Sequence, residues 1–185
     1  MREGRFSSAC LWLFPSNYLL FSLSISKIGI TNMKAVIQRI LRGSVTSEGA
    51  VVGSVEKGMS VLVGISREDT KEDMEYIIRK LLGVRIWADE AGKMWSKNVK
   101  EIDGGILLIS QFTLMHVMKG NKPDFHHAMN PEAALEMFNT LRDTLRKEYA
   151  EDKVATGHFQ HYMNIEQVMD GPVTLVIDSK DKKNN

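Results

Sequence analysis

The amino-acid sequence predicts an α/β domain in which two helices cover a mixed sheet. Two short, continuous apolar runs, MSVLVGI at 59–65 and GILLI at 105–109, have the length of strands buried on both faces. Two longer stretches carry apolar residues at helical spacing and begin with capping residues. Strands and helices do not alternate regularly, so a doubly wound parallel sheet is not expected.

The composition of the 185-residue chain excludes several classes of protein. With 24 basic and 23 acidic side chains it is nearly neutral, which argues against a protein held to nucleic acid mainly by bulk charge, although a local basic patch is compatible with it. Cys10 is the single cysteine, so no disulfide forms within the chain. The glycine-rich phosphate motifs and paired cysteines of common cofactor sites are absent, and we expect neither a cofactor nor a metal ion.

Residues 1–32 differ from the rest of the chain. They are rich in serine, basic rather than acidic, and their apolar run is interrupted at Pro15, which makes it too short to span a membrane. Two interpretations stay open: a disordered leader that precedes the true start at Met33, or an organelle-targeting segment. We expect the domain at 33–178, a frayed polar tail at 179–185 and a cytoplasmic protein unless the leader redirects it.

The first half of the domain is expected to contain four strands and a helix. Residues 34–40 read as a strand, 43–48 and 51–55 as a hairpin around Gly49, and 59–65 as the first buried strand. Thr70 and Asp73 form a capping-box pair at the start of a helix. Its apolar stripe ends before Gly83 and consists of Met74, Ile77, Ile78, Leu81 and Leu82.

The second half is expected to alternate between strands and one long helix. Residues 84–88 read as a strand, and the buried strand at 105–109 runs directly into SQFTL at 110–114. The second helix begins with Asn130 as N-cap and Pro131 in its first turn. Two strands, 162–168 and 173–178, are expected on either side of the turn Met169-Asp170-Gly171-Pro172.

The polar residues that follow the second buried strand are the first candidate site. Ser110, Gln111 and Thr113 lie where substrate groups are often bound in α/β domains, and their donors could orient a carbonyl or stabilise an oxyanion. The alternative is that these hydroxyls bond only their own backbone at a strand end. No histidine lies in local register with either hydroxyl, so a hydroxyl nucleophile lacks an evident base.

Three further motifs each have two interpretations. Residues 170–174 (DGPVT) form either a simple turn or a cis X-Pro bond that presents two adjacent carbonyls in one direction. The loop at 119–125 (KGNKPDF) could hold a phosphate or be solvated. His158 and His161 could approach a metal ion, but scattered surface histidines are favoured because no carboxylate stands at a suitable spacing.

Taken together, these motifs resemble the D-aminoacyl-tRNA deacylases. MKAVIQR at 33–39 resembles the N-terminal strand of the family, and SQFTL at 110–114 is similar to one of its signature motifs. KGNKPDF at 119–125 is similar to the eukaryotic form of a family loop, and DGPVT at 170–174 matches most of a second signature. The resemblance extends from Met33 to about Asp178.

The resemblance implies a fold, an assembly and an activity. The fold is a largely antiparallel, barrel-like sheet covered by two main helices, and the assembly is a homodimer without a membrane segment. The activity is hydrolysis of the ester that joins a D-amino acid, or glycine mischarged on tRNA(Ala), to the 3′-terminal adenosine of tRNA. This is an editing reaction that follows charging.

The resemblance also assigns roles to residues. Gly171 and Pro172 would enter the partner's site as a main-chain wedge that excludes L side chains, with Arg39 bracing it and Thr174 completing the motif. Ser110, Gln111, Phe112 and Thr113 would position the ester. Phe159 and Met163 would line the adenine pocket, their alternative role being core packing.

Two points stay open within this assignment. The family has been discussed with the motif threonine, here Thr113, as nucleophile and with the RNA 2′-hydroxyl assisting; the missing base favours the second. The family usually has asparagine where this chain has Met169, and methionine cannot cap the turn with the hydrogen bonds of an amide. The competing hypotheses are a non-catalytic nucleic-acid-binding module with this fold, and an esterase of small molecules.

Overall fold

The computed structural model describes residues 32–181. Within this part of the chain α1 (Lys71–Gly83) and α2 (Pro131–Glu148) are the two α-helices, and η1 (Phe112–Met115) and η2 (Glu151–Lys153) are short 3₁₀ turns. The strands are β1 (Lys34–Ser47), β2 (Ala50–Val55), β3 (Gly58–Gly64), β4 (Gly105–Ser110), β5 (Val117–Lys119), β6 (Lys122–Asp124), β7 (Val154–Thr156) and β8 (Asn164–Asp178). No helix within residues 32–181 is long and apolar enough to cross a membrane.

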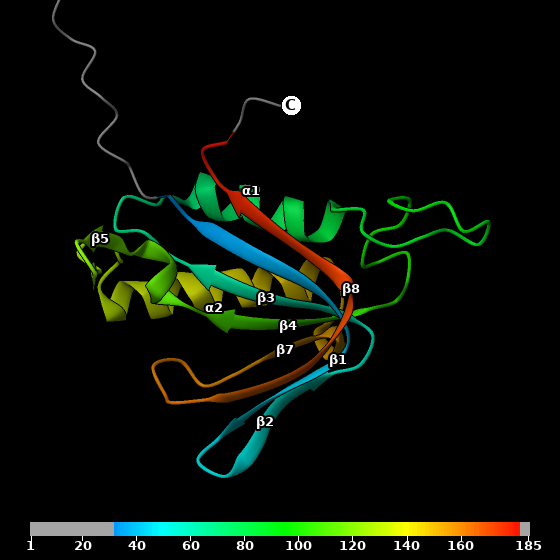
Figure 1. Cartoon of the computed structure of the whole chain (residues 1–185), viewed down its shortest axis with the longest axis horizontal. Coiled ribbons are helices and arrows are strands. Elements are labelled where there is room, and N and C mark those ends of the chain that lie inside the picture. Colours follow the sequence, from blue (N-terminus) through cyan, green and yellow to red (C-terminus); the bar gives the residue numbers. More distant parts are fainter. Residues whose placement is uncertain (1–31, 182–185) are drawn as a thin grey trace, which may run out of the picture. The chain divides into compact units, whose positions relative to one another are not determined.

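The main sheet is mixed, as the sequence predicts. Its order is β2-β1-β3-β4-β7, and β8 pairs with β1. Strand β1 is antiparallel to β2, β3 and β8, whereas β3, β4 and β7 run parallel to one another. The long strand β1 therefore carries the antiparallel part of the sheet, and β8 follows it along most of its length (Figure 1).

The sheet curves until its two ends approach each other. A Cβ atom added to Gly53 in β2 would lie 2.3 Å from the carbonyl oxygen of Thr156 at the end of β7, so the two strands can meet only because residue 53 has no side chain. This close approach, together with the curvature visible in Figure 1, gives the nearly closed, barrel-like sheet that was expected.

Strand β4 is buried on both faces because it separates two apolar clusters. Ile106 and Leu108 belong to the larger cluster, in which α1 and α2 cover one face of the sheet. Leu107 and Ile109 belong to a smaller cluster with Val45 on the inner face of the curved sheet. The continuous apolar run of this strand is thus explained by burial on two sides.

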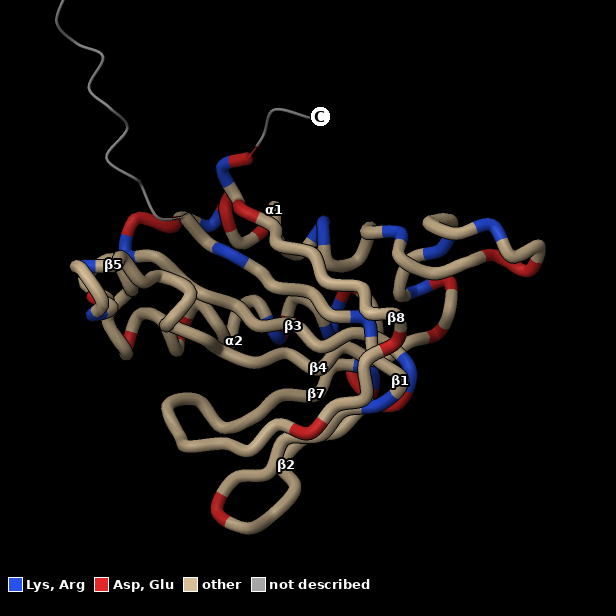
Figure 2. The backbone as a smooth tube through the Cα atoms, in the orientation of Figure 1, with Lys and Arg blue, Asp and Glu red and all other residues tan. Residues whose placement is uncertain are grey.

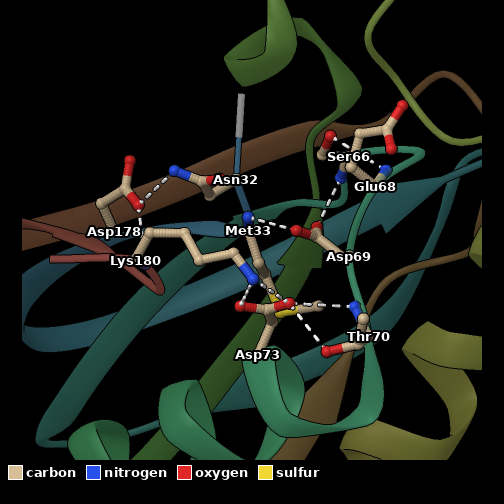
Figure 3. A network of polar contacts seen from close by, with 9 residues as sticks. All are labelled: Asn32, Met33, Ser66, Glu68, Asp69, Thr70, Asp73, Asp178 and Lys180. Carbon is tan, nitrogen blue, oxygen red and sulfur yellow. Dashed lines mark hydrogen bonds and ion pairs between the residues drawn. The ribbon is translucent and has the colours of Figure 1, made fainter. Parts of the chain in front are cut away.

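A polar network holds the two ends of the described chain (Figure 3). The buried amide of Met33 donates to Asp69 Oδ1 at 2.7 Å, and the Ser66 amide donates to Asp69 Oδ2 at 2.6 Å. Lys180 binds Asp73 at 2.8 Å, while the Thr70 amide donates to the same carboxylate at 3.0 Å, as a capping box requires. Lys180 is therefore held against α1 and not frayed, and residues 182–185 and the predicted leader, apart from Asn32, lie outside the described residues.

Three sequence predictions about elements are wrong, and three short strands were missed. The strands expected at 34–40 and 43–48 are one continuous strand, β1. Residues 84–88 form no strand; Trp87 makes only an isolated bridge to Lys97 within a long loop. The two strands expected around residues 169–172 are one strand, β8, because pairing with β1 continues on both sides of an irregularity opposite residues 38–40. The short strands β5, β6 and β7 were not predicted, since three residues are too few to show a period.

Candidate functional site

The three parallel strands of the sheet end at one edge, where the loops that follow them meet. Val63 of β3 is in register with Ser110 of β4, and Leu108 of β4 with Thr156 of β7. Because strands that run in the same direction place their carboxyl ends together, residues from three distant parts of the sequence converge here. The segment before α2 is tied to the same edge, since Met129 N donates to Ile65 O at 3.0 Å.

A cavity of about 830 Å³ lies at this edge. It has the size of a small-molecule site and is bounded by side chains from all three loops and from the start of α2. Five of the residues singled out in the sequence line it: Ser110, Gln111, Phe112, Phe159 and Met163. The other residues that line the cavity are mostly apolar and include Val63, Ile65, Ile109, Phe125, Ala128, Met129, Asn130, Pro131, Ala134, Gln160, His161, Tyr162 and Ile165.

The polar motif turns away from the sheet immediately after β4. Gln111 N donates to Val63 O at 2.7 Å, and the next residues form the turn η1. The side-chain amide of Gln111 donates to Thr113 Oγ1, while Nδ1 of His116 contacts the backbone oxygen of Thr113 at 2.9 Å and not its hydroxyl. Thr113 does not line the cavity, and within residues 32–181 no base is bonded to its hydroxyl.

The position of this turn depends on Gly64 at the end of β3. A Cβ atom at residue 64 would lie 2.7 Å from Leu114 Cβ and 2.8 Å from Met115 Cε, both closer than van der Waals contact allows. The absence of a side chain at residue 64 therefore brings η1 against the sheet and sets how far Gln111 and Phe112 reach into the cavity.

The opposite wall of the cavity is formed by the loop between β7 and β8. Phe159 packs against the buried ring of Phe138 with centroids 5.8 Å apart, so its orientation is fixed by α2. Met163 passes over Gly157, where a Cβ atom would lie 2.3 Å from Met163 Sδ. An aromatic ring and a thioether thus form one apolar wall of the cavity, and both side chains also pack against the apolar clusters of the sheet.

The loop at 119–125 is a paired hairpin that reaches the cavity at Phe125. Strands β5 and β6 make it a hairpin, and Lys119 pairs with Asp124. Hydrogen bonds from Lys119 and His126 hold the pKa of the Asp124 carboxyl well below its usual range, so this acid stays ionised. The neighbouring Phe125 meets Phe112 edge to face, with centroids 5.1 Å apart.

The second group of predicted residues lies elsewhere in the chain. Arg39 is buried in β1, and its Nε lies 3.1 Å from Asp170 Oδ2 and donates to Asp170 O at 3.2 Å. Its Nη1 donates to Ile86 O. The peptide bond between Gly171 and Pro172 is cis, and both residues are exposed. Arg39 therefore braces the residue that directly precedes this pair.

The register of the sheet separates this pair from the cavity. Arg39 is opposite Met59 near the start of β3, whereas Ser110 is opposite Val63 at the end of that strand. At about 3.3 Å per residue, the two positions are about 13 Å apart along the strands. Neither Gly171 nor Pro172 lines the cavity, and neither does Thr174, which pairs with Gln38.

Comparison with known proteins identifies the family. Residues 36–178 match the family described as D-Tyr-tRNA(Tyr) deacylase. The chain belongs to the D-Tyr-tRNA(Tyr) deacylase family.

Relatives of this family are similar along almost the whole described domain. The chain is 72% identical to D-aminoacyl-tRNA deacylase 1 of Leishmania major over 149 residues. This alignment covers 80% of this chain and 98% of the Leishmania protein. It is 46% identical over 147 residues to D-aminoacyl-tRNA deacylase 1 of Homo sapiens, covering 80% of this chain and 70% of the human protein.

Two solved structures share the fold. The structure named c-Myc DNA Unwinding Element Binding Protein is 46% identical, has a TM-score of 0.76 and covers 78% of this chain and 97% of its own. A probable eukaryotic D-amino acid tRNA deacylase is 16% identical, has a TM-score of 0.67 and covers 80% of this chain and 100% of its own. The second likeness shows the fold alone.

Met169, which stands where the D-Tyr-tRNA(Tyr) deacylase family usually has asparagine, makes a side-chain contact of its own. Gln167 Nε2 lies 3.4 Å from Met169 Sδ and donates to Gln38 Oε1 at 2.7 Å. The thioether thus accepts a hydrogen bond from a side chain that also links β8 to β1. Met169 contributes an acceptor to the base of the Gly171 loop, although it lacks the amide of asparagine.

Several residues of this deacylase-family cavity were not found from the sequence. Gly64 and Gly157 do not line the cavity, but the absence of their side chains lets η1 and Met163 pack closely, and its place at the end of a buried strand is the one sequence signal for Gly64. Phe125 and Tyr162 line the cavity from loops whose fold depends on tertiary contacts. Within residues 32–181, His, Cys, Asp and Glu form no group of three or more that could hold a metal ion.

Proposed function

We propose that the protein hydrolyses D-aminoacyl-tRNA to free D-amino acid and tRNA, and that it also acts on glycine mischarged on tRNA(Ala). The observation that carries this proposal is the shared cavity of Ser110, Gln111 and Phe112 with Phe159 and Met163, in a chain of the deacylase family. The polar residues face the ester and the apolar wall holds the terminal adenine.

Hydrolysis of the aminoacyl ester depends more on how the substrate is positioned than on a strong nucleophile. A water oxygen adds to the carbonyl carbon, the bond from that carbon to the ribose 3′-oxygen breaks, and the 3′-oxygen takes up a proton. The 2′-hydroxyl of the same ribose lies beside the water oxygen and the 3′-oxygen, and it assists the transfer of the proton between them. Ser110, Gln111 and the Phe112 amide orient the carbonyl and the ribose, while Gln111 holds the hydroxyl of Thr113, which does not line the cavity.

Chiral selection requires a second copy of the chain. In one chain Arg39, which holds the residue before Gly171, lies about 13 Å along the strands from Ser110, and neither Gly171 nor Pro172 lines the cavity. A two-fold dimer would bring the pair of one subunit to the cavity of the other. There its main chain would meet an L side chain, while a D side chain or glycine would clear it.

The charge distribution is compatible with recognition of the acceptor end alone. Figure 2 shows Lys and Arg interspersed with Asp and Glu, and the loop from β7 to β8 carries neither. Such a surface makes few phosphate contacts along the body of a tRNA, so binding should depend weakly on salt.

The deciding experiment is a deacylation assay with matched substrates. The full chain should release the D-amino acid from D-tyrosyl-tRNA and glycine from glycyl-tRNA(Ala), and leave L-tyrosyl-tRNA intact. Thr113→Val should keep most of the activity, whereas a tRNA that ends in 2′-deoxyadenosine, charged at its 3′-hydroxyl, should be cleaved at least about tenfold more slowly. Hydrolysis of the D and L substrates at equal rates would contradict the proposed selection.

A second candidate is a nucleic-acid-binding module without catalysis. The similar structure named c-Myc DNA Unwinding Element Binding Protein favours it, because that name describes DNA binding. This candidate requires binding that survives Gly171→Ala and no ester cleavage at any protein concentration. Turnover of simple amino-acid esters without RNA would instead indicate a small-molecule esterase.

A further inference from the structure

A second cavity of about 410 Å³ adjoins the proposed adenosine pocket. We call it the lateral cleft. It shares Phe159 and His161 with the first cavity, so these two side chains form the boundary between them. The remaining wall comes from α2, from the end of β7 and from the loop that follows it, and consists of Leu135, Phe138, Asn139, Arg142, Thr156, Gly157 and His158.

The lateral cleft contains flat rings suited to a base. His158 and His161 meet edge to face, with centroids 5.3 Å apart, and both are exposed to solvent. Phe159 is held against the buried Phe138. A ring held in this way, as Phe159 is, can stack with a nucleobase without first being ordered, and stacking accepts any base.

The same cleft contains an ordered guanidinium. Arg142 donates from Nη1 to Asn139 Oδ1 at 2.9 Å and makes two contacts with Asp143, at 2.7 and 3.1 Å. These contacts use three of the five N–H groups of arginine, and within residues 32–181 no hydrogen bond engages the other two. The side chain is 27% exposed, so the remaining donors can meet an anion.

We propose that the lateral cleft binds the nucleotide that precedes the terminal adenosine, the penultimate cytidine of the acceptor end. This inference rests on the proposed function, because it places the terminal adenosine on the other side of Phe159. The cytosine stacks between His158 and Phe159, and its phosphate meets Arg142. Adjacent cavities that share one wall are what two consecutive, unstacked nucleotides require.

The proposal predicts how tightly the protein and its variants bind the dinucleotide CpA relative to adenosine. The dinucleotide CpA should bind the wild-type protein about tenfold more tightly than adenosine, because it adds one stacked base and one phosphate contact. His158→Ala removes an exposed ring and Arg142→Gln removes the charge, and each should abolish most of this difference without changing the affinity for adenosine. Lys147→Ala, which removes an exposed charge from α2 outside the cleft, is the matched control.

Kinetics separate this inference from the proposed function. His158→Ala should raise KM for D-tyrosyl-tRNA about tenfold with little change in kcat, and leave hydrolysis of 3′-O-D-tyrosyl-adenosine unchanged. Equal binding of CpA and adenosine to the wild-type protein, or equal effects on both substrates, would overturn the lateral cleft and leave the proposed function intact. Failure of the wild-type protein to cleave either ester would overturn both.

Discussion

At Gly171 the backbone φ angle is +133°, a region that L side chains rarely adopt. A Cβ atom there would lie 2.9 Å from Val173 N and 3.0 Å from Val173 Cγ2. Arg39 holds the preceding residue, so the loop cannot easily shift to relieve the contact. Two single residues, Gly171 and Arg39, thus specify the conformation of the loop around Gly171.

Gly171→Ala should destabilise the fold by about 1–3 kcal/mol, because it adds both backbone strain and a steric overlap. If the loop selects the substrate, D-tyrosyl-tRNA deacylation should fall at least about tenfold. Urea unfolding and the deacylation assay measure the two effects. The control is Gly92→Ala, where φ is +80° but a Cβ atom meets nothing within 4 Å; it should lose some stability and keep full activity.

The hydrogen bond from Gln167 to Met169 predicts how the loop tolerates substitution. Met169→Asn should leave the ratio of D- to L-tyrosyl-tRNA hydrolysis unchanged within about threefold, because asparagine also offers an acceptor to the Gln167 amide. Gln167→Ala should lower that ratio, because it removes both this bond and the link to Gln38. An unchanged ratio in Gln167→Ala would show that the link has no role in selection.

At the scale of elements, the site depends on how closely η1 approaches β3. The turn carries Phe112 into the cavity and begins directly after Gln111, which is bonded to Val63 of β3. No side chain intervenes, since the end of β3 is Gly64. The geometry of the polar motif is therefore set by packing between a strand and a turn far apart in sequence.

Gly64→Ala should displace this turn. A Cβ atom 2.7 Å from Leu114 Cβ overpacks the contact, and we expect a loss of about 1–3 kcal/mol in unfolding free energy together with a lower kcat. Gly83→Ala is the matched control, because a Cβ atom at the end of α1 lies in open space and should not lower stability or activity. Equal behaviour of the two variants would disprove the packing argument.

At the scale of the whole molecule, the network around Asp69 predicts how stability depends on pH. Burial raises the pKa of Asp69 from 3.8 to about 6, despite the amides of Ser66 and Met33. An acid with a raised pKa binds protons more tightly in the folded protein, so its contribution to stability declines as the pH rises from about 4 to about 6. Burial also acts to raise the pKa of Asp73, but hydrogen bonds from Lys180 and Thr70 lower it to about 2, so its stabilising contribution is lost only below that window.

Asp69→Asn should therefore lose less stability at pH 7 than at pH 4. The variant lacks one acceptor for the two amides and is destabilised at both values, but it no longer carries the cost of ionisation. Urea midpoints of both proteins between pH 4 and pH 7 measure the difference. Parallel pH profiles would show that Asp69 does not titrate in this range.

The proposed dimer predicts complementation between two impaired variants. Gln111→Ala impairs the cavity and Gly171→Ala impairs the loop, so each homodimer should keep at most about a tenth of the wild-type activity. After unfolding and refolding together in equal amounts, half of the dimers are mixed and each has one intact site, which should restore about a quarter of the wild-type activity. If the mixture is no more active than the homodimers, the site is not shared between subunits.

The sequence by itself determined much of the fold. Apolar runs between glycines located β3 and β4, and capping residues located both helices, because these signals are local and depend on only a few neighbouring residues. The signature motif at 110–114 also located Ser110 and Gln111, and the family resemblance pointed to Phe159 and Met163; all four line one cavity. Residues 84–88 were misread because their bridge partner, Lys97, lies across a loop.

Only the tertiary structure decided which of these residues meet. The parallel register of β3, β4 and β7 assembles the cavity, and the register of β1 with β3 and β8 keeps Gly171 and Pro172 away from it. Gly53, Gly64 and Gly157 act through backbone or side-chain atoms more than 45 residues away or across a turn. Such contacts leave no local pattern, because steric fit depends on where distant segments pack and not on the residues beside them.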